Sequence, residues 1–102
     1  NSLQVIAVQD GNICIADEEQ PSKGKFYSLI GGRQDEGETP LEGAKRELLE
    51  ETGLKANTWT KLMEMHLSNS VSDELAIIYV AEELEQQEEV IQNLILFYLA
   101  RL

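Results

Sequence analysis

Cysteine, histidine and proline are scarce in this sequence, which has one, one and two of them among 102 residues. A single cysteine, Cys14, excludes a disulfide within the chain and argues against a thiolate metal cluster. Because Cys14 lies in an apolar stretch, we predict that it is a small buried core residue. The lone His66 falls in a strand-like segment, and we interpret it as structural instead of as a catalytic base. This sparing use of cysteine fits the cytoplasm, which is the compartment that we expect.

Long hydrophobic runs are also missing. The longest apolar run, residues 94–100, is far shorter than the roughly 20 residues that a membrane-spanning helix needs. No charged-then-apolar signal opens the chain, so we expect neither export nor a membrane partner. A length of 102 residues suits one core, and we predict a single domain over 1–102. Because an alternating apolar segment begins almost at the first residue, we expect an N-terminal segment to be missing from this sequence.

Basic residues are few, with 8 lysines and arginines against 19 acidic residues and a net charge of −11. A chain with this charge repels nucleic-acid backbones, so we expect no nucleic-acid partner. It would also repel a phosphate ester. If the substrate is a diphosphate, bound divalent cations must therefore invert the local electric field.

The order of apolar and polar segments predicts an α+β fold. Asp10-Gly11-Asn12 is a strong hairpin turn signal between two apolar runs. Thr39 can cap a helix that has Pro40 in its first turn and ends at Gly53. We expect an α/β/α sandwich, in which a mixed β-sheet is flanked by helices. The expected elements are strands over 3–8, 13–15, 26–30, 59–67 and 75–80, helices over 40–52 and 91–102, and polar loops over 17–25, 32–39, 68–74 and 82–89.

Three glutamates of the first expected helix, Glu47, Glu50 and Glu51, are spaced at i, i+3 and i+4, so their carboxylates gather on one helical face. Like charges at this spacing destabilise a helix unless a cation joins them. Carboxylate oxygens suit a hard ion such as Mg²⁺ or Mn²⁺. Such an ion could neutralise a diphosphate, polarise its phosphorus and acidify the attacking water. The alternative is that the glutamates form a solvent-exposed face.

A longer motif surrounds these glutamates and carries a family resemblance. Residues 32–54 match the Nudix box, G-x(5)-E-x(7)-R-E-U-x-E-E-x-G-U, where U is a bulky aliphatic residue. The chain therefore resembles the Nudix hydrolases, and the flanking strands extend the likeness over most of the sequence. The matching residues are Gly32, Glu38, Arg46, Glu47, Leu48, Glu50, Glu51, Gly53 and Leu54.

The resemblance implies the Nudix fold and Mg²⁺-dependent hydrolysis of the diphosphate linkage of a nucleoside diphosphate derivative. It makes Glu47, Glu50 and Glu51 metal ligands, and with Arg46 they form the catalytic set. The remaining roles are structural or substrate-binding. Arg46 and Glu38 correspond to a supporting ion pair that holds the loop against the helix. Gly31 and Gly32 permit a backbone turn near the metals and, with Arg33, form the expected substrate-binding segment, while Gly53 ends the helix.

The downstream segment Ser72-Asp73-Glu74 resembles the ADP-ribose pyrophosphatase branch of that family. ADP-ribose or another nucleoside diphosphate sugar is therefore the first expected substrate. One alternative is an enzyme acting on nucleoside triphosphates, oxidised or ordinary. Another is a non-catalytic nucleotide-binding domain, which the full set of box glutamates disfavours. The same branch implies a homodimer formed through the sheet and the N-terminal region.

The general base stays open in the sequence, with Glu74, Glu83 and Glu88 as candidates. Family members usually have a further strand and a long loop before the terminal helix. Here only about ten residues separate the 75–80 strand from that helix. Either the loop is short or residues near 84–90 are missing from the sequence, and we favour the second interpretation. Phe26 and Tyr27 are interpreted as core residues in preference to base-stacking ones.

Overall fold

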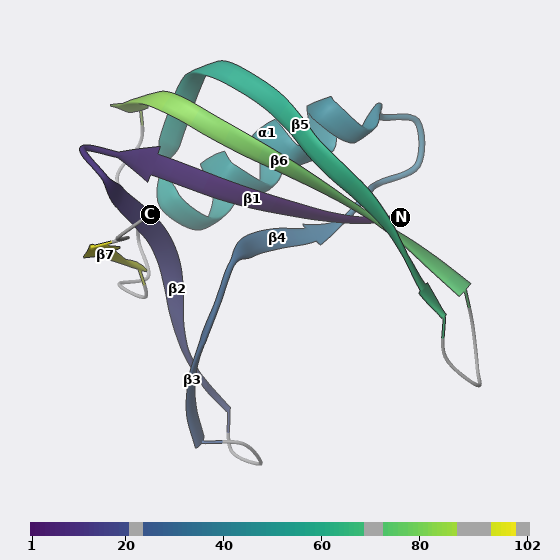
Figure 1. The fold of residues 1–102 in the computed structure, drawn as a ribbon, viewed down its shortest axis with the longest axis horizontal. Helices are drawn as coiled ribbons and strands as arrows, with labels where there is room; N and C mark the ends of the chain where they lie inside the picture. The colour runs from purple at the N-terminus through teal and green to yellow at the C-terminus, as the bar shows by residue number, and fades with distance from the viewer. Residues whose placement is uncertain (21–23, 69–72, 88–94, 100–102) are drawn as a thin grey trace.

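The computed structural model describes residues 1–20, 24–68, 73–87 and 95–99, which form a mixed β-sheet with one helix beside it (Figure 1). The elements are β1 (Ser2–Gln9), β2 (Asn12–Gln20), β3 (Gly24–Ser28), β4 (Ile30–Arg33), α1 (Pro40–Thr52), β5 (Leu54–Ser68), β6 (Asp73–Gln86) and β7 (Ile95–Leu99). The strand order is β3-β2-β1-β6-β5, with β4 also paired to β1 and β7 paired to β2. β1 and β6 run parallel and the other pairs are antiparallel. The expected α+β class with a mixed sheet is confirmed.

β1 lies between β6 and β4 and supplies much of the core. Leu3, Val5 and Ala7 are fully buried, while the residues between them are only half-buried. Since successive strand residues face opposite sides, one side of β1 packs into the core that α1 covers. Asp10 and Gly11 then adopt φ angles of 53° and 78°, as a two-residue hairpin turn requires. The predicted hairpin between β1 and β2 is confirmed.

α1 begins and ends as its sequence predicts. Thr39 Oγ1 accepts a hydrogen bond from the Glu42 N–H, and Glu42 Oε1 accepts one from the Thr39 N–H, at 3.1 and 2.8 Å. This reciprocal pair is a capping box. At the other end Gly53 has a φ of 72°, and its N–H donates to Leu49 O. The buried residues of the helix are Gly43, Ala44, Leu48 and Thr52.

The expected second helix over 91–102 is wrong in its described part. Residues 95–99 form β7, which pairs antiparallel with β2; the rest of the expected helix lies outside the described residues. The segment reads Ile-Leu-Phe-Tyr-Leu, and a short apolar run of this kind suits a strand as well as a helix. In the described ranges α1 is therefore the only helix that covers the sheet, and it packs on one face. No helix in those ranges is both long and apolar enough to cross a membrane.

Two polar segments that we expected to be loops belong to strands. β6 continues to Gln86, because the first residues of β5 pair with it from Leu54 onward. β2 extends to Gln20 and β3 starts at Gly24, so much of the 17–25 segment forms a hairpin ladder. In both places a partner strand overrides a local composition that favours loops. The expected strand over 26–30 is divided between β3 and β4.

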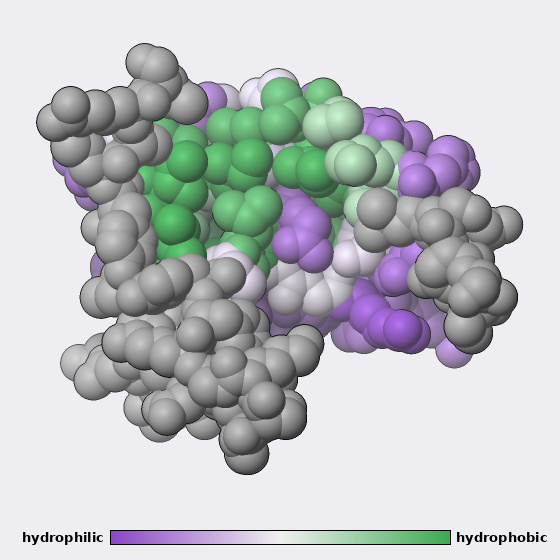
Figure 2. Space-filling model, turned by 60° about the horizontal axis from the view of Figure 1, so that its bottom comes forward, coloured by the Kyte–Doolittle hydropathy of each residue, from purple (hydrophilic) through white to green (hydrophobic). Residues whose placement is uncertain are grey.

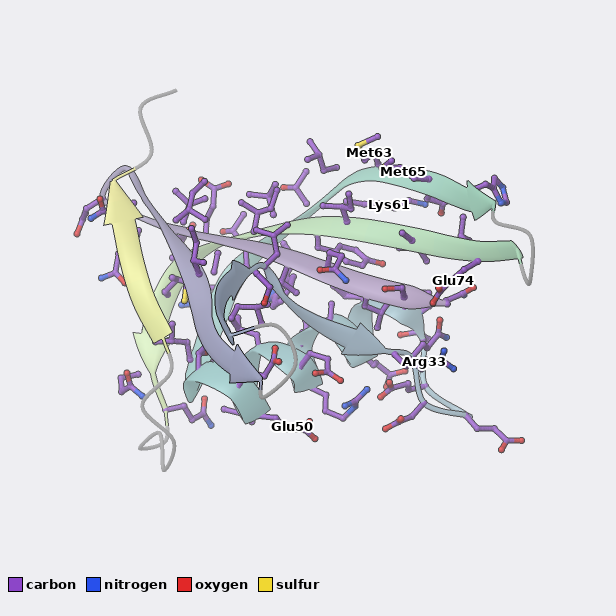
Figure 3. The ribbon with its side chains drawn as sticks, turned by 90° about the horizontal axis from the view of Figure 1, so that it is seen from below. Arg33, Glu50, Lys61, Met63, Met65 and Glu74 are labelled. Atoms are coloured by element: carbon purple, nitrogen blue, oxygen red, sulfur yellow. The ribbon has the colours of Figure 1, made fainter. Side chains whose placement is uncertain are left out.

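The face of the sheet opposite α1 is apolar and partly exposed. Its side chains come from alternate positions of three neighbouring strands, where Ile6 pairs with Val80 and Ile78 pairs with Met63. Figure 2 shows hydrophobic side chains gathered on this side of the molecule. Met63 and Met65 are 44% and 40% exposed, and in Figure 3 they point away from α1.

Candidate functional site

The short strand β4 brings its backbone against the acidic side of α1. The Gly31 N–H donates a hydrogen bond of 2.9 Å to Glu51 Oε2. A Cβ at Gly32 would lie 2.5 Å from Glu47 Oε1, so only glycine leaves room for this carboxylate where it stands. A Cβ at Gly31 would lie 2.2 Å from Leu3 O in β1. These two glycines therefore let one backbone segment contact both β1 and the carboxylates of α1.

The backbone turn expected at Gly31 and Gly32 is wrong. Both residues lie inside β4 and pair with Gln4 and Leu3 of β1. Among the glycines that the structure describes, positive φ angles occur at positions 11, 37 and 53 only. The chain leaves β4 and turns at Gly37, whose φ is 86°. Close approach, and not a turn, is the reason for the double glycine.

Arg46 lies at the centre of the site and contacts four carboxylates. Its Nη2 and Nε donate to the two oxygens of Glu38, at 2.8 and 3.1 Å. Its Nη1 donates to Glu47 Oε1 at 2.8 Å and to Glu50 Oε2 at 3.2 Å. Asp35 Oδ2 lies 3.3 Å from Nε. One guanidinium thus faces four negative groups, and the local charge stays strongly negative.

The contact between Arg46 and Glu38 perturbs both groups and fixes the loop. Hydrogen bonds from Arg46, and then from the Asp35 N–H, hold the pKa of Glu38 below its usual value. The bond to Glu38 in turn raises the pKa of Arg46, so both groups are charged at neutral pH. Arg46 Nη2 also donates to Arg33 O at 2.9 Å, which joins the end of β4 to α1. The Arg33 side chain is exposed at this end of the sheet (Figure 3).

Sequence reasoning missed Gln34 and Asp35. Gln34 Nε2 donates to Glu38 O at 2.7 Å, and Gln34 also bonds Asn1 through its side chain and its backbone N–H. The Asp35 N–H donates to Glu38 Oε1, while the Asp35 carboxylate faces Arg46. Both residues therefore shape the loop before α1. No spacing rule reveals them, because their partners come from separate parts of the chain: Asn1 at its start, Glu38 in the loop and Arg46 in α1.

The three predicted metal ligands lie on the side of α1 that meets β4, and each already has a partner. Glu47 and Glu50 accept from Arg46, and Glu51 accepts from the Gly31 N–H. Across the described ranges, no group of three or more acidic, histidine or cysteine side chains converges on a point that could hold a metal ion. The donor chemistry nevertheless fits a hard cation, because all three groups are carboxylates. Their three negative charges also exceed the single positive charge of Arg46.

The candidate bases lie at different ends of the sheet. Ser2 of β1 pairs with both Ala76 of β6 and Arg33 of β4. Glu74 is two residues before Ala76 in β6, so it lies at the end of the sheet that carries Arg33, as Figure 3 also shows. Glu83 lies beyond the far end of β1, where its carboxylate accepts from the Thr58 hydroxyl at 2.6 Å. Glu88 lies outside the described residues, as do the side chains of Phe26 and Tyr27.

Cys14 is fully buried, as predicted, and the charge of one candidate metal ligand affects the pKa of its thiol. Burial, and secondarily the negative charge of Glu51, raise the pKa of Cys14 to about 11. The thiol is therefore neutral near pH 7, which fits a core residue and not a nucleophile. His66 is exposed on β5.

Comparison with known proteins gives the same family as the sequence motif. The model of the NUDIX domain family matches residues 3–94. ADP-ribose pyrophosphatase of Bacillus subtilis is 34% identical over 90 residues, which are 86% of this chain and 49% of that protein. The oxidized purine nucleoside triphosphate hydrolase of Mus musculus is 32% identical over 76 residues, or 74% of this chain and 49% of that protein. The chain thus spans about half the length of these curated relatives.

A solved structure described as an ADP compounds hydrolase has the same fold. It superposes with a TM-score of 0.82 at 22% sequence identity, covering 95% of this chain and 55% of that one. At this level of identity the likeness concerns the fold, and the fold includes the mixed sheet with α1 packed on it.

Proposed function

From the premise that this chain belongs to the Nudix family, we propose that it hydrolyses the diphosphate linkage of a nucleoside diphosphate derivative with Mg²⁺ as cofactor. The observation that carries the proposal is the approach of the β4 backbone to Glu47 and Glu51. Because two adjacent glycines stand there, the β4 backbone comes close to these carboxylates, and we propose that a phosphate chain lies along this backbone beside them. Mn²⁺ is the alternative cation, because it shares the preference for oxygen ligands.

The proposed roles follow the positions of the side chains. Glu47, Glu50 and Glu51 would hold the metal, which when bound supplies neutralisation of the diphosphate and acidification of the attacking water. Arg46 and Glu38 keep the loop from β4 fixed against α1, so the ligand carboxylates face the substrate-binding segment. The exposed Arg33 offers a cation to the diphosphate.

We further propose Glu74 as the group that accepts the proton of the attacking water. Its position at the same end of the sheet as Arg33 supports this choice over Glu83, whose carboxylate is bonded to Thr58 at the other end. A carboxylate in that role commonly contributes about 10²- to 10⁴-fold to the rate.

ADP-ribose or another nucleoside diphosphate sugar is the proposed substrate. The likeness to the Bacillus subtilis ADP-ribose pyrophosphatase and the Ser72-Asp73-Glu74 segment support it. The second candidate is a nucleoside triphosphate, which the likeness to the mouse hydrolase supports. A homodimer is a further proposal, and the apolar sheet face that includes Met63, Ile78 and Val80 is the surface that supports it.

The test is phosphate release from a panel of nucleoside diphosphate sugars and triphosphates with Mg²⁺. We expect Glu51→Gln to lower kcat/KM at least about 100-fold. Glu36→Gln is the matched control, because Glu36 is an exposed acidic residue inside the same motif and outside the ligand positions. Nucleotide binding without turnover would favour the non-catalytic alternative. An active Glu51→Gln enzyme, or no turnover of any substrate, would contradict the proposal.

A further inference from the structure

A pocket of about 250 Å³ opens between the C-terminal half of α1 and the start of β5. With about 3.6 residues per turn, its helical residues Lys45, Leu48 and Leu49 project from the side of α1 away from Glu47 and Glu50. Figure 1 shows the ribbon of β5 bending around the end of α1 before it runs along β6. The pocket is therefore separate from the candidate hydrolase site, although both use the same helix.

The floor of the pocket is apolar and one wall is aromatic. Leu48, Leu54 and Ala56 are buried beneath it, at 0%, 7% and 6% exposure. Trp59 forms the wall, and its Nε1–H donates to Ala56 O at 3.1 Å. The indole also meets Tyr79 edge to face, with ring centroids 6.2 Å apart. Because these contacts fix the indole, the pocket is already formed before any ligand arrives.

Two lysines line this pocket, Lys45 from α1 and Lys55 from β5, and both are exposed. Within the described part of the chain, neither makes an ion pair, whereas Lys61 is paired with Glu64. Two acidic residues are neighbours of these lysines: Glu42 lies one turn before Lys45 on α1, and Glu85 of β6 pairs with Lys55. Two exposed lysines at one apolar pocket make a local concentration of positive charge in a chain with only 8 basic residues and a net charge of −11.

We propose that this pocket binds a small amphiphilic anion, with a short aliphatic chain or single ring and one anionic group. The apolar part packs on Leu48, Leu54 and Trp59, and the anionic group lies near Lys45 and Lys55. Pockets for drug-sized ligands measure about 300–1,000 Å³, so a volume of about 250 Å³ admits only a smaller molecule. The proposal depends on contacts of this pocket alone and not on the hydrolase activity.

Octanoate and octylamine are suitable probes, because they share an apolar chain and carry opposite charges at neutral pH. Trp59 is the only tryptophan, so its indole N–H gives one resolved NMR signal at the pocket wall. We expect octanoate to shift this signal saturably, with a dissociation constant on the order of a few millimolar. Octylamine should bind at least about tenfold more weakly, since the two lysines repel it.

The lysine variants separate charge recognition from simple apolar binding. Exposed ion pairs are weak, worth about two- to fivefold each, so the double variant Lys45→Gln/Lys55→Gln should bind octanoate about tenfold more weakly. Lys61→Gln is the matched control and should bind like the parent, because Lys61 lies outside the pocket. Equal binding of the two probes, an unchanged double variant, or no saturable shift with octanoate would each overturn the proposal.

Discussion

Replacing Gly32 by alanine should affect the activity of the protein and its stability to different extents. The added Cβ would lie 2.5 Å from Glu47 Oε1 and 2.6 Å from its Cδ. Ordinary contact begins at 3.4 Å, so the carboxylate must retreat by about 0.9 Å, the difference between these distances. Glu47 can make this movement by rotating its side chain, because the clash involves only the far end of that side chain. The backbone of β4 can stay where it is.

We therefore expect a large loss of activity and a small change in stability. A displacement of about 1 Å at a reacting centre can cost about 100-fold in rate, so kcat/KM should fall by about this factor. The unfolding free energy should change by less than about 1 kcal/mol, because alanine restricts the unfolded chain and offsets part of the strain. Phosphate release with Mg²⁺ and urea denaturation measure the two quantities.

Gly31→Ala is the matched control, one residue away in the same strand. Its Cβ would lie 2.2 Å from Leu3 O and 3.1 Å from Gln4 Cα, which are backbone atoms of β1. The β1–β4 pairing must then separate, and we expect a loss of about 1–3 kcal/mol or more. The reasoning is refuted if Gly32→Ala keeps the activity of the parent, or if it loses as much stability as Gly31→Ala.

Two further predictions concern single side chains. Glu74→Gln should lower kcat about 100-fold, while Glu83→Gln should leave it unchanged. Steady-state kinetics on the preferred substrate measures both effects. Equal effects of the two variants would show that Glu74 is not the base. Cys14 should resist thiol reagents at pH 7.5 in the folded protein. Because its pKa rises from 9.0 to about 11 on folding, the unfolded chain ionises first, and stability is lost as pH rises from about 9 to about 11. The difference in unfolding free energy between the parent and Cys14→Ala should fall over that window by up to about 3 kcal/mol, and a flat difference would contradict the assignment.

The sequence could predict α1 and the β1–β2 hairpin because their signals are local. Thr39, Glu42 and Gly53 carry the cap geometry themselves, and Asp10 with Gly11 carries the turn. The box residues Glu38, Arg46, Glu47, Glu50 and Glu51 likewise lie in one helix and the loop before it. Each of these features depends on backbone conformations that the residues in question favour by themselves.

The errors arise where a distant partner decides the structure. The acidic residues near Glu85 form a strand because Lys55 and its neighbours pair with them from β5. β7 forms because β2 offers an edge, which no local pattern in residues 95–99 reveals. The sequence does not reveal the role of Gly32 for the same reason, because the residue that constrains it, Glu47, belongs to another element. Contacts across elements therefore limit sequence reasoning more than local propensity does.

The Arg46 contacts explain how the candidate site can take up a cation without losing its framework. If Glu47 and Glu50 turn to a metal, Arg46 gives up only the bonds of Nη1. Its Nε and Nη2 still bond Glu38, and Nη2 still bonds Arg33 O. The loop thus stays attached to α1 by bonds that do not involve the proposed ligands. Glu38→Gln should consequently loosen the loop and weaken Mg²⁺ binding indirectly, whereas Glu50→Gln should weaken Mg²⁺ binding without loosening the loop.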